Sequence, residues 1–328
     1  MLQIAEAAGV SVTTVSHALS GKRPVRPETV VRIQRLVEQH GFVPNSSGVR
    51  LQSGRSRVIG LAVPDISHWY FGSIAKGVEQ RANERDYGLI ICGTMNADPR
   101  SEKRYFNMLR TRSIDGLVYT TSRSTSDLHE LVTAARGSSI VLADEAIAAL
   151  PEIPSVTTTV GEGARHVGHH LRDLGHTRAV VIAGFAGLGS TTERIEAFRE
   201  SFPNALVLYG DFEQRSGYDA MGDLLANEVT FTCVFAHNDF MAIGAIRRLR
   251  EHGLRVPEDI SVVGFDDVDI ATVVTPALTT VRKDMVEIGR RSADILLDLI
   301  NGTAPAPRSE VLPVELVVRG TTGPAPRS

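Results

Sequence analysis

Residues 5–19 read AEAAGVSVTTVSHAL, and this short stretch predicts two helices joined by a tight turn. Ile4 to Ala8 has the small, apolar composition of a short helix, and Gly9 supplies the sharp turn after it. The Ser11 hydroxyl can then cap a second helix that runs from Val12 to about Leu19. Small apolar side chains would form the core between the two helices: Ala5, Val10 and Val15.

A third helix follows the loop GKRPV at residues 21–25. Pro27 suits its first position, and Gly41 ends it. Val30, Ile33 and Val37 recur between them at helical spacing. Two interpretations stay open at this point: a three-helix bundle without a ligand, or a helix-turn-helix whose second helix enters the major groove of DNA.

The charge of the chain is unevenly distributed. Residues 1–57 contain eight Lys and Arg against three Glu, a net charge of +5. Since the whole chain of 328 residues has a formal charge of -3, the remainder carries -8. A basic first segment on an acidic body is the electrostatic pattern expected when one end binds phosphate.

The composition and the lack of export or membrane signals in this sequence lead us to expect a cytoplasmic protein. Hydrophobic residues make up 42% and charged residues 22%, which is typical of ordered globular proteins. The sequence shows neither a signal segment nor an apolar run near the roughly 20 residues of a membrane span, so we expect no membrane partner. Cys92 and Cys233 each lie in an apolar run, which predicts two buried thiols in a reducing compartment and no disulfide.

Beyond residue 57, short apolar runs alternate with amphipathic segments, such as helices expected at about 71–85 and 102–111. Continuous apolar strands separated by helices predict parallel sheets covered on both faces. The predicted strands are RVIGLAV (57–63), GLIICGT (88–94), DGLVYTT (115–121), SSIVLA (138–143), AVVIAG (179–184), ALVLYG (205–210), CVFAHN (233–238) and ISVVGFD (260–266).

Ligands of such sheets bind beyond the carboxyl ends of the strands, so residues directly after each run are candidate binding residues. Arg194 lies on the segment that follows AVVIAG, and the other candidates stand at strand ends: Thr120, Asp144, Phe212, Asn238 and Asp266. Structural alternatives remain for three of them. Asp266 can cap a loop, Asn238 can cap a helix, and Phe212 can belong to the core.

Two other motifs do not support a cofactor. HVGHHL at 166–171 has metal-binding residue types, but it lies on an amphipathic helix, so we expect no metal. VGEGARHVG at 160–168 lacks the third glycine of a dinucleotide loop, and the sequence contains no Gly-Lys-Ser/Thr. The sequence also shows no Ser-His-Asp or Cys-His arrangement that the fold would assemble, so we expect no enzyme activity.

The resemblance to a known family begins in the same residues. IAEAAGVSVTTVSHALSG (4–21), HGFVPN (40–45), LQSGRSRVIGLAVPD (51–65) and FAHNDFMAIGAIRRLREHGLRVPEDISVVGFDD (235–267) resemble the lactose-repressor (LacI/GalR) family. The resemblance implies an N-terminal all-α helix-turn-helix headpiece followed by an α/β periplasmic-binding-protein-like sensor with two doubly wound parallel-sheet lobes.

It also implies domain boundaries. The headpiece would span 1–44, the hinge 45–57 and the sensor 58–320. Because the chain would cross between lobes three times, lobe one comprises about 58–156 and 283–310, and lobe two about 157–282 and 311–320. Residues 321–328 are expected to be a disordered tail.

In the family, the positions of Val12, Thr13 and His17 face DNA bases. The family usually has arginine at the position of His17, and arginine can hold guanine with two hydrogen bonds. A neutral imidazole offers one donor and one acceptor, so we expect a different preferred base at the operator position that His17 faces. Phosphate contacts or caps are expected from the remaining polar side chains of this segment: Ser11, Thr14 and Ser16.

The segment from Asn45 to Gln52 resembles the family's DNA-contacting hinge helix, in which a leucine wedges into the minor groove. Leu51 holds that position, although an ordinary linker leucine remains an alternative. We expect this weakly helical stretch to order only on DNA. The family usually has Thr-Ile-Lys-Asp before the first helix, and Met1, Leu2 and Gln3 stand where the last three of these residues would be. Because the capping threonine is missing from this sequence, we expect either a start upstream of Met1 or a frayed first turn.

For the ligand, the resemblance assigns Arg194, Asn238 and Asp266 to ligand hydroxyls and Phe212 to stacking. Thr120 and Asp144 match polar positions in the first lobe, and Phe71 matches a wall. Purine-responsive members have an arginine where this chain has Leu188, which favours a sugar or sugar derivative. Thr159 and Val160 stand where many relatives have Asp-Asn, so no particular sugar is predicted.

The resemblance therefore predicts a transcription regulator, with repression its expected mode. Its partners would be a near-palindromic double-stranded operator, a small-molecule effector and a second copy in a homodimer, with DNA and effector coupled allosterically. Two rivals fit less well. A solute-binding protein needs a signal peptide and no basic headpiece, and an enzyme needs a phosphate loop or a paired acid and base.

Overall fold

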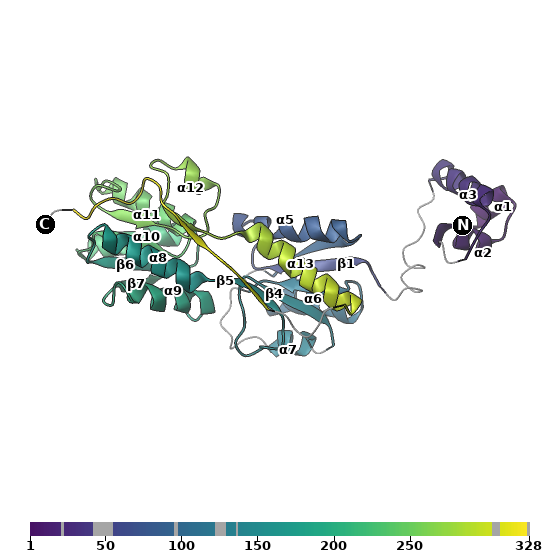
Figure 1. The fold of residues 1–328 in the computed structure, drawn as a ribbon, viewed down its shortest axis with the longest axis horizontal. Helices are drawn as coiled ribbons and strands as arrows, with labels where there is room; N and C mark the ends of the chain where they lie inside the picture. Colours follow the sequence, from purple (N-terminus) through teal and green to yellow (C-terminus); the bar gives the residue numbers. More distant parts are fainter. Residues whose placement is uncertain are drawn as a thin grey trace. The chain divides into compact units, whose positions relative to one another are not determined.

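The computed structural model describes residues 1–20, 23–41, 55–94, 98–121, 129–135, 137–303 and 309–326. The chain divides into two compact units, residues 1–56 and 57–328, which are treated separately below (Figure 1).

The first unit contains three helices: α1 (Leu2–Ala8), α2 (Val12–Ser20) and α3 (Pro27–Gln39). Gly9 takes the left-handed conformation, with φ of 62°, that a turn directly after a helix requires. Buried side chains from all three helices form one small core: Ile4, Ala5, Ala8, Val15 and Ile33. α1 begins at Leu2, and Met1 makes no side-chain capping bond to it. The helix-turn-helix arrangement predicted from residues 5–19 is confirmed.

Lobe one of the second unit is built on a six-stranded parallel sheet with the spatial order β11-β5-β4-β3-β1-β2. Its strands are β1 (Val58–Val63), β2 (Gly88–Gly93), β3 (Gly116–Tyr119), β4 (Ser139–Ala143), β5 (Ser155–Thr158) and β11 (Glu310–Leu312). Helices α5 (Trp69–Glu84) and α13 (Met285–Asn301) share one core cluster with the sheet, and α6 (Pro99–Arg110) and α7 (His129–Ala135) share a second. The sheet is therefore covered on both faces, as its apolar strands predicted.

Lobe two repeats this arrangement around a four-stranded parallel sheet with the order β7-β6-β8-β9. The strands are β6 (Ala179–Ala183), β7 (Leu206–Tyr209), β8 (Cys233–Ala236) and β9 (Ser261–Val263). One core cluster contains α8 (Val160–Asp173) and α9 (Gly189–Arg199), and the other contains α10 (Gln214–Ala226) and α11 (Asp239–Glu251). A single short turn of helix, α12 (Ile270–Val273), follows β9.

The chain passes between the lobes three times (Figure 1). The passages follow β5, β10 (Thr280–Arg282) and β11, and β10 pairs antiparallel with β12 (Glu315–Val317). The last passage was expected near residue 310, but Glu310 to Leu312 still pairs with β5, so the crossing comes after Leu312. The two-lobed α/β fold predicted from the sequence is confirmed.

The prediction of a disordered tail from residue 321 is wrong for the residues that the structure describes, which extend to 326. Thr321 is fully buried, and its hydroxyl donates to the Val262 carbonyl at 2.7 Å. The backbone N–H of Gly323 donates to the Ser261 hydroxyl, and that of Ala325 donates to the Leu174 carbonyl. These long-range hydrogen bonds to lobe two hold a segment whose place at the end of the chain had suggested disorder.

Cys92 and Cys233 are both buried and unpaired, as predicted. Burial raises the pKa of the Cys92 thiol to about 12, which keeps it protonated.

Candidate functional site

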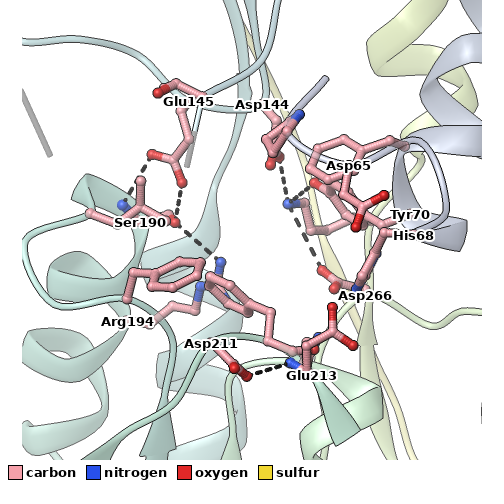
Figure 2. A pocket seen from close by; sticks show the side chains of 18 residues that line it. Asp65, His68, Tyr70, Asp144, Glu145, Ser190, Arg194, Asp211, Glu213 and Asp266 are labelled. Carbon is pink, nitrogen blue, oxygen red and sulfur yellow. Dashed lines mark hydrogen bonds and ion pairs between the residues drawn. The ribbon is translucent and has the colours of Figure 1, made fainter. Parts of the chain in front are cut away.

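A cavity of about 340 Å³ lies where the strand-end loops of the two lobes meet (Figure 2). This volume suits a small organic ligand. Six of the seven residues predicted for ligand binding line it: Phe71, Asp144, Arg194, Phe212, Asn238 and Asp266. Five of these six were predicted from strand ends or from the segment after a strand, and Phe71 was predicted from the family resemblance.

Thr120, the seventh, does not line the cavity. It is buried, and its hydroxyl donates to the Ala62 carbonyl at 2.9 Å, which ties the end of β3 to β1. The next residue, Thr121, reaches the cavity wall instead. Since successive residues of an extended segment point to opposite sides, an error of one position exchanges a core residue for a lining one.

Lys283 organises the wall where the second passage leaves β10. Its ammonium group donates to Asp144 Oδ1 at 2.6 Å and to the Tyr70 hydroxyl at 2.7 Å, and its side chain is only 1% exposed. Burial opposes ionisation of Asp144, yet the Lys283 charge holds the pKa of this carboxyl below its ordinary value. Asp144 and Lys283 therefore form a fixed ion pair in the cavity wall.

Asp266 stands on the opposite lobe with a positive φ of 106°, an uncommon conformation for a residue with a side chain. Its Oδ1 lies 3.9 Å from Lys283 Nζ. Burial raises the pKa of Asp266 to about 6, although the Lys283 charge opposes the rise. The strained backbone directs a carboxyl group into the cavity (Figure 2).

Arg194 is buried on α9 and is held by several partners. Its guanidinium donates to the His237 carbonyl and, at 3.3 Å, to the Ser190 hydroxyl. The same group lies over the Phe265 ring, 4.4 Å from its centroid. These contacts fix the guanidinium plane before any ligand binds, which lowers the entropic cost of using it for recognition.

Glu145 links the two lobes across the cavity. It follows β4 in lobe one, and its carboxyl accepts from both the backbone N–H and the hydroxyl of Ser190, at the start of α9 in lobe two (Figure 2). Burial raises the pKa of Glu145 to about 7, and the neighbouring Asp144 charge adds to the rise. A bond between lobes at the cavity wall makes the lobe arrangement part of the site.

Phe212 supplies the aromatic wall of the cavity, and its ring has room there because Gly184 has no side chain. A Cβ at Gly184 would lie 1.9 Å from Phe212 Cζ, so glycine is needed at the end of β6 for the ring to stand there. The Asn238 side-chain amide donates to the Phe212 carbonyl at 2.7 Å, which fixes the backbone that carries the Phe212 ring. The Asn238 Oδ1 atom accepts from the Met241 N–H at 2.9 Å. Asn238 is therefore both the α11 cap and a lining residue.

In the headpiece, the predicted base-facing residues lie at the start of α2. Val12 is 38% exposed and Thr13 is exposed, whereas His17, in the last turn, is half-buried. Ser11 caps the helix by accepting from the Thr14 N–H at 3.1 Å, and the two hydroxyls lie 2.9 Å apart. Ser16 is half-buried. Asn45 and Leu51 lie outside the described residues.

Comparison with known proteins identifies the family. The description "Bacterial regulatory proteins, lacI family" matches residues 1–45, and "Periplasmic binding protein-like domain" matches residues 169–322. The HTH-type transcriptional regulator DegA of Bacillus subtilis strain 168 is 31% identical over 98% of this chain and 97% of its own length. The chain belongs to the lacI family of bacterial regulatory proteins.

Two solved structures are similar to this lacI-family chain over nearly its whole length. The lac repressor dimer bound to operator and the anti-inducer ONPF has a TM-score of 0.88 and 28% identity, covering 98% of both chains. The transcriptional regulator CelR in complex with cellobiose has a TM-score of 0.75 and 29% identity, covering 97% of this chain and 98% of that one. The family resemblance seen in the sequence is thereby confirmed.

Sequence reasoning missed several lining residues of this lacI-family cavity. The strand-end rule applies equally to several of them. Lys283 stands immediately after β10, and four others stand two residues after a strand: Asp65, Thr121, Glu145 and Asp211. Ser190 and Tyr70 come from the first turns of α9 and α5, which that rule does not cover. The other missed polar residues are His68 and Glu213.

Over the ranges that the structure describes, no three His, Cys, Asp or Glu side chains gather in a way that could hold a metal ion. His170, from the motif HVGHHL, instead lies 3.0 Å from the Thr322 hydroxyl, in the segment after β12. Within the same ranges, the helices are too short or too polar to span a bilayer.

Proposed function

We propose that this lacI-family regulator is a cytoplasmic repressor that binds a near-palindromic operator as a homodimer and is controlled by a small molecule in the lobe cavity. One observation carries the proposal. A helix-turn-helix unit with Val12 and Thr13 exposed shares a chain with a cavity lined by six residues that the sequence singled out. Near-palindromic DNA follows from the two-fold symmetry of a dimer.

The chain regions take distinct parts in this proposal. Residues 1–44 contact the major groove, 45–57 form the hinge with Asn45 and Leu51 on DNA, and 58–320 bind the effector and dimerise. The division of the structure after residue 56 supports a boundary close to the proposed end of the hinge. We assign no catalytic residues, because the cavity groups serve binding.

A sugar or sugar derivative is the proposed effector class. Asp144, Arg194 and Asp266 offer charged hydrogen-bonding groups, and Phe212 offers an apolar face, which together suit a ring with hydroxyls at its rim. Leu188 lines the cavity where purine-responsive relatives place arginine. The similar structure of CelR holds cellobiose, a sugar.

Retardation of a palindromic DNA fragment from the region upstream of the protein's own coding sequence tests this function. Full-length protein should bind that fragment much more tightly than a scrambled fragment of equal length. Affinity should fall by more than about tenfold between roughly 50 and 200 mM salt, because phosphate contacts release counterions. Equal binding to both fragments, or binding insensitive to salt, would contradict the proposal.

A substitution at His17 tests which residues face the bases. His17→Arg restores a side chain that can hold guanine with two hydrogen bonds, and such a pair is worth about 1–3 kcal/mol of discrimination. Selection from randomised DNA should therefore return a guanine-richer half-site for the variant than for the wild type. Identical selected sites would remove His17 from base recognition.

A further inference from the structure

The cavity contains far more negative than positive side chains. Two cationic side chains line it, Arg194 and Lys283. Six residues with carboxyl groups line the same cavity: Asp65, Asp144, Glu145, Asp211, Glu213 and Asp266. Carboxylates accept hydrogen bonds from the hydroxyls of a neutral sugar and from an ammonium group alike, but an excess of negative charge attracts the ammonium group more strongly.

Both cations are already engaged by the protein. Lys283 is bonded to Asp144 and to the Tyr70 hydroxyl at 2.6 and 2.7 Å. Arg194 is bonded to the His237 carbonyl and to Ser190. Among the carboxyl groups of the cavity, only Asp144 therefore has a cationic side chain of the wall at hydrogen-bonding distance. Neutral N–H and hydroxyl groups of the protein donate to Asp65, Glu145 and Asp211, and these bonds leave the negative charge unpaired.

Asp266 is the buried carboxyl group of the cavity that most clearly lacks a hydrogen-bond donor. It is only 7% exposed and points into the cavity (Figure 2). Its carboxyl accepts no hydrogen bond from the residues that the structure describes, and Lys283 Nζ at 3.9 Å is beyond hydrogen-bonding reach. A buried carboxyl without a donor is costly, so the site is poised to accept a donor from a ligand.

The aromatic wall adds an independent feature. Phe212 stands between Asp211 and Glu213 in the chain, all three line the cavity, and Phe185 packs against the Phe212 ring at 5.6 Å between centroids. A ring face beside carboxyl groups is a favourable environment for an organic cation, because the ring quadrupole and the acids attract the same charge.

We propose that the cavity binds a hydroxylated organic cation of hexosamine size and class, in preference to the neutral parent sugar. The ammonium group supplies the donor that Asp266 lacks and the positive charge that the acids around Phe212 attract, while Asp144 and Arg194 serve the hydroxyls. This inference rests on the proposed function, of which it specifies the effector.

Matched titrations of full-length protein test the inference. The probes are D-glucosamine, D-galactosamine and D-mannosamine, each compared with glucose, galactose or mannose. Trp69, the only tryptophan of the chain, precedes the cavity residue Tyr70 and provides a fluorescence signal, with calorimetry as a second readout. At least one amine should bind about tenfold more tightly than its parent sugar, a difference of about 1.4 kcal/mol.

The inference is overturned if no amine binds more tightly than its parent sugar. It is also overturned if no amine binds at about 10 mM, a concentration high enough to detect a millimolar Kd. The retardation experiment is run without ligand and with each amine and parent sugar, because an effector either releases or strengthens DNA binding. Specific DNA binding in any of these conditions, with no preference for amines, rejects this inference alone, whereas no specific DNA binding in any condition rejects the proposed function.

Asp266→Asn preserves shape and removes the charge. It should reduce the preference for the amine to below about threefold, because an amide cannot attract the ammonium group as a carboxylate does. Glu196→Gln, an exposed position on α9 outside the cavity wall, removes the same charge and should leave the preference unchanged. An unchanged preference in Asp266→Asn, in a variant with wild-type thermal unfolding, also overturns the inference.

Discussion

At the residue scale, Glu145 makes the stability of the sensor depend on pH. Burial raises its pKa from 4.5 to about 7, so between these values the folded chain binds more protons than the unfolded chain. The free energy of unfolding should therefore fall as pH rises through this window. One pKa unit corresponds to about 1.4 kcal/mol, so the contribution of Glu145 is up to roughly 3 kcal/mol.

Glu145→Gln should flatten that fall, because an amide does not titrate while its oxygen still accepts from Ser190. Denaturant unfolding of both proteins at about pH 5 and pH 8 measures the effect. Glu152→Gln, an exposed change in the same lobe, should keep the wild-type pH dependence. An equal fall with pH in wild type and Glu145→Gln would show that Glu145 does not carry the linkage.

The same residues show how far the sequence predicts the site. The carboxyl ends of parallel strands converge on one edge of a sheet, so the sequence alone placed four lining residues at this edge: Asp144, Phe212, Asn238 and Asp266. Arg194 was predicted from the segment after a strand, and Phe71 only from the family resemblance. The ion pair of Lys283 with Asp144 joins residues 139 positions apart, and the bond of Glu145 to Ser190 joins the two lobes. No local pattern predicts these pairings, because they depend on how the lobes meet.

At the scale of elements, α5 and α13 pack with their backbones in close contact. A Cβ at Gly77 would lie 2.0 Å from the Val286 carbonyl oxygen, and one at Gly289 would lie 2.1 Å from the Ile74 carbonyl oxygen. Gly77→Ala must therefore separate the helices and should destabilise the sensor by about 3 kcal/mol or more. Thermal unfolding of the full chain measures this loss.

Gly72 provides the matched control on the same helix. It is exposed, and no atom lies within 4 Å of its added Cβ. Gly72→Ala should stabilise the sensor by up to about 1 kcal/mol, because alanine favours helix. If both variants unfold at the wild-type temperature, the close contact of the helices does not matter for stability.

Elements differ in how well the sequence predicts them. β1 and β3 are buried along nearly their whole length and stand out as continuous apolar runs. β10, β11 and β12 are three residues each and include charged side chains, so their sequences do not distinguish them from loops. β10 and β12 pair with each other, and β11 pairs with β5, where the chain crosses between the lobes. The ordered conformation of residues 321–326 likewise depends on long-range hydrogen bonds, in this case to lobe two.

At the scale of the whole molecule, a ligand in the cavity touches both lobes at once, so its binding energy can favour one lobe arrangement over another. If that arrangement also determines operator affinity, the two binding events must be coupled equally in both directions. The factor by which an effector changes operator affinity then equals the factor by which operator changes effector affinity, typically about 5- to 150-fold.

Two titrations measure the two factors. Fluorescence anisotropy of labelled operator, with and without saturating effector, gives one of them. Trp69 fluorescence during effector titration, with and without saturating operator, gives the other. The proposed mechanism requires the factors to agree within experimental error. A large effect on operator affinity with no reciprocal effect on effector affinity would mean that the effector acts on DNA binding through a site other than this cavity.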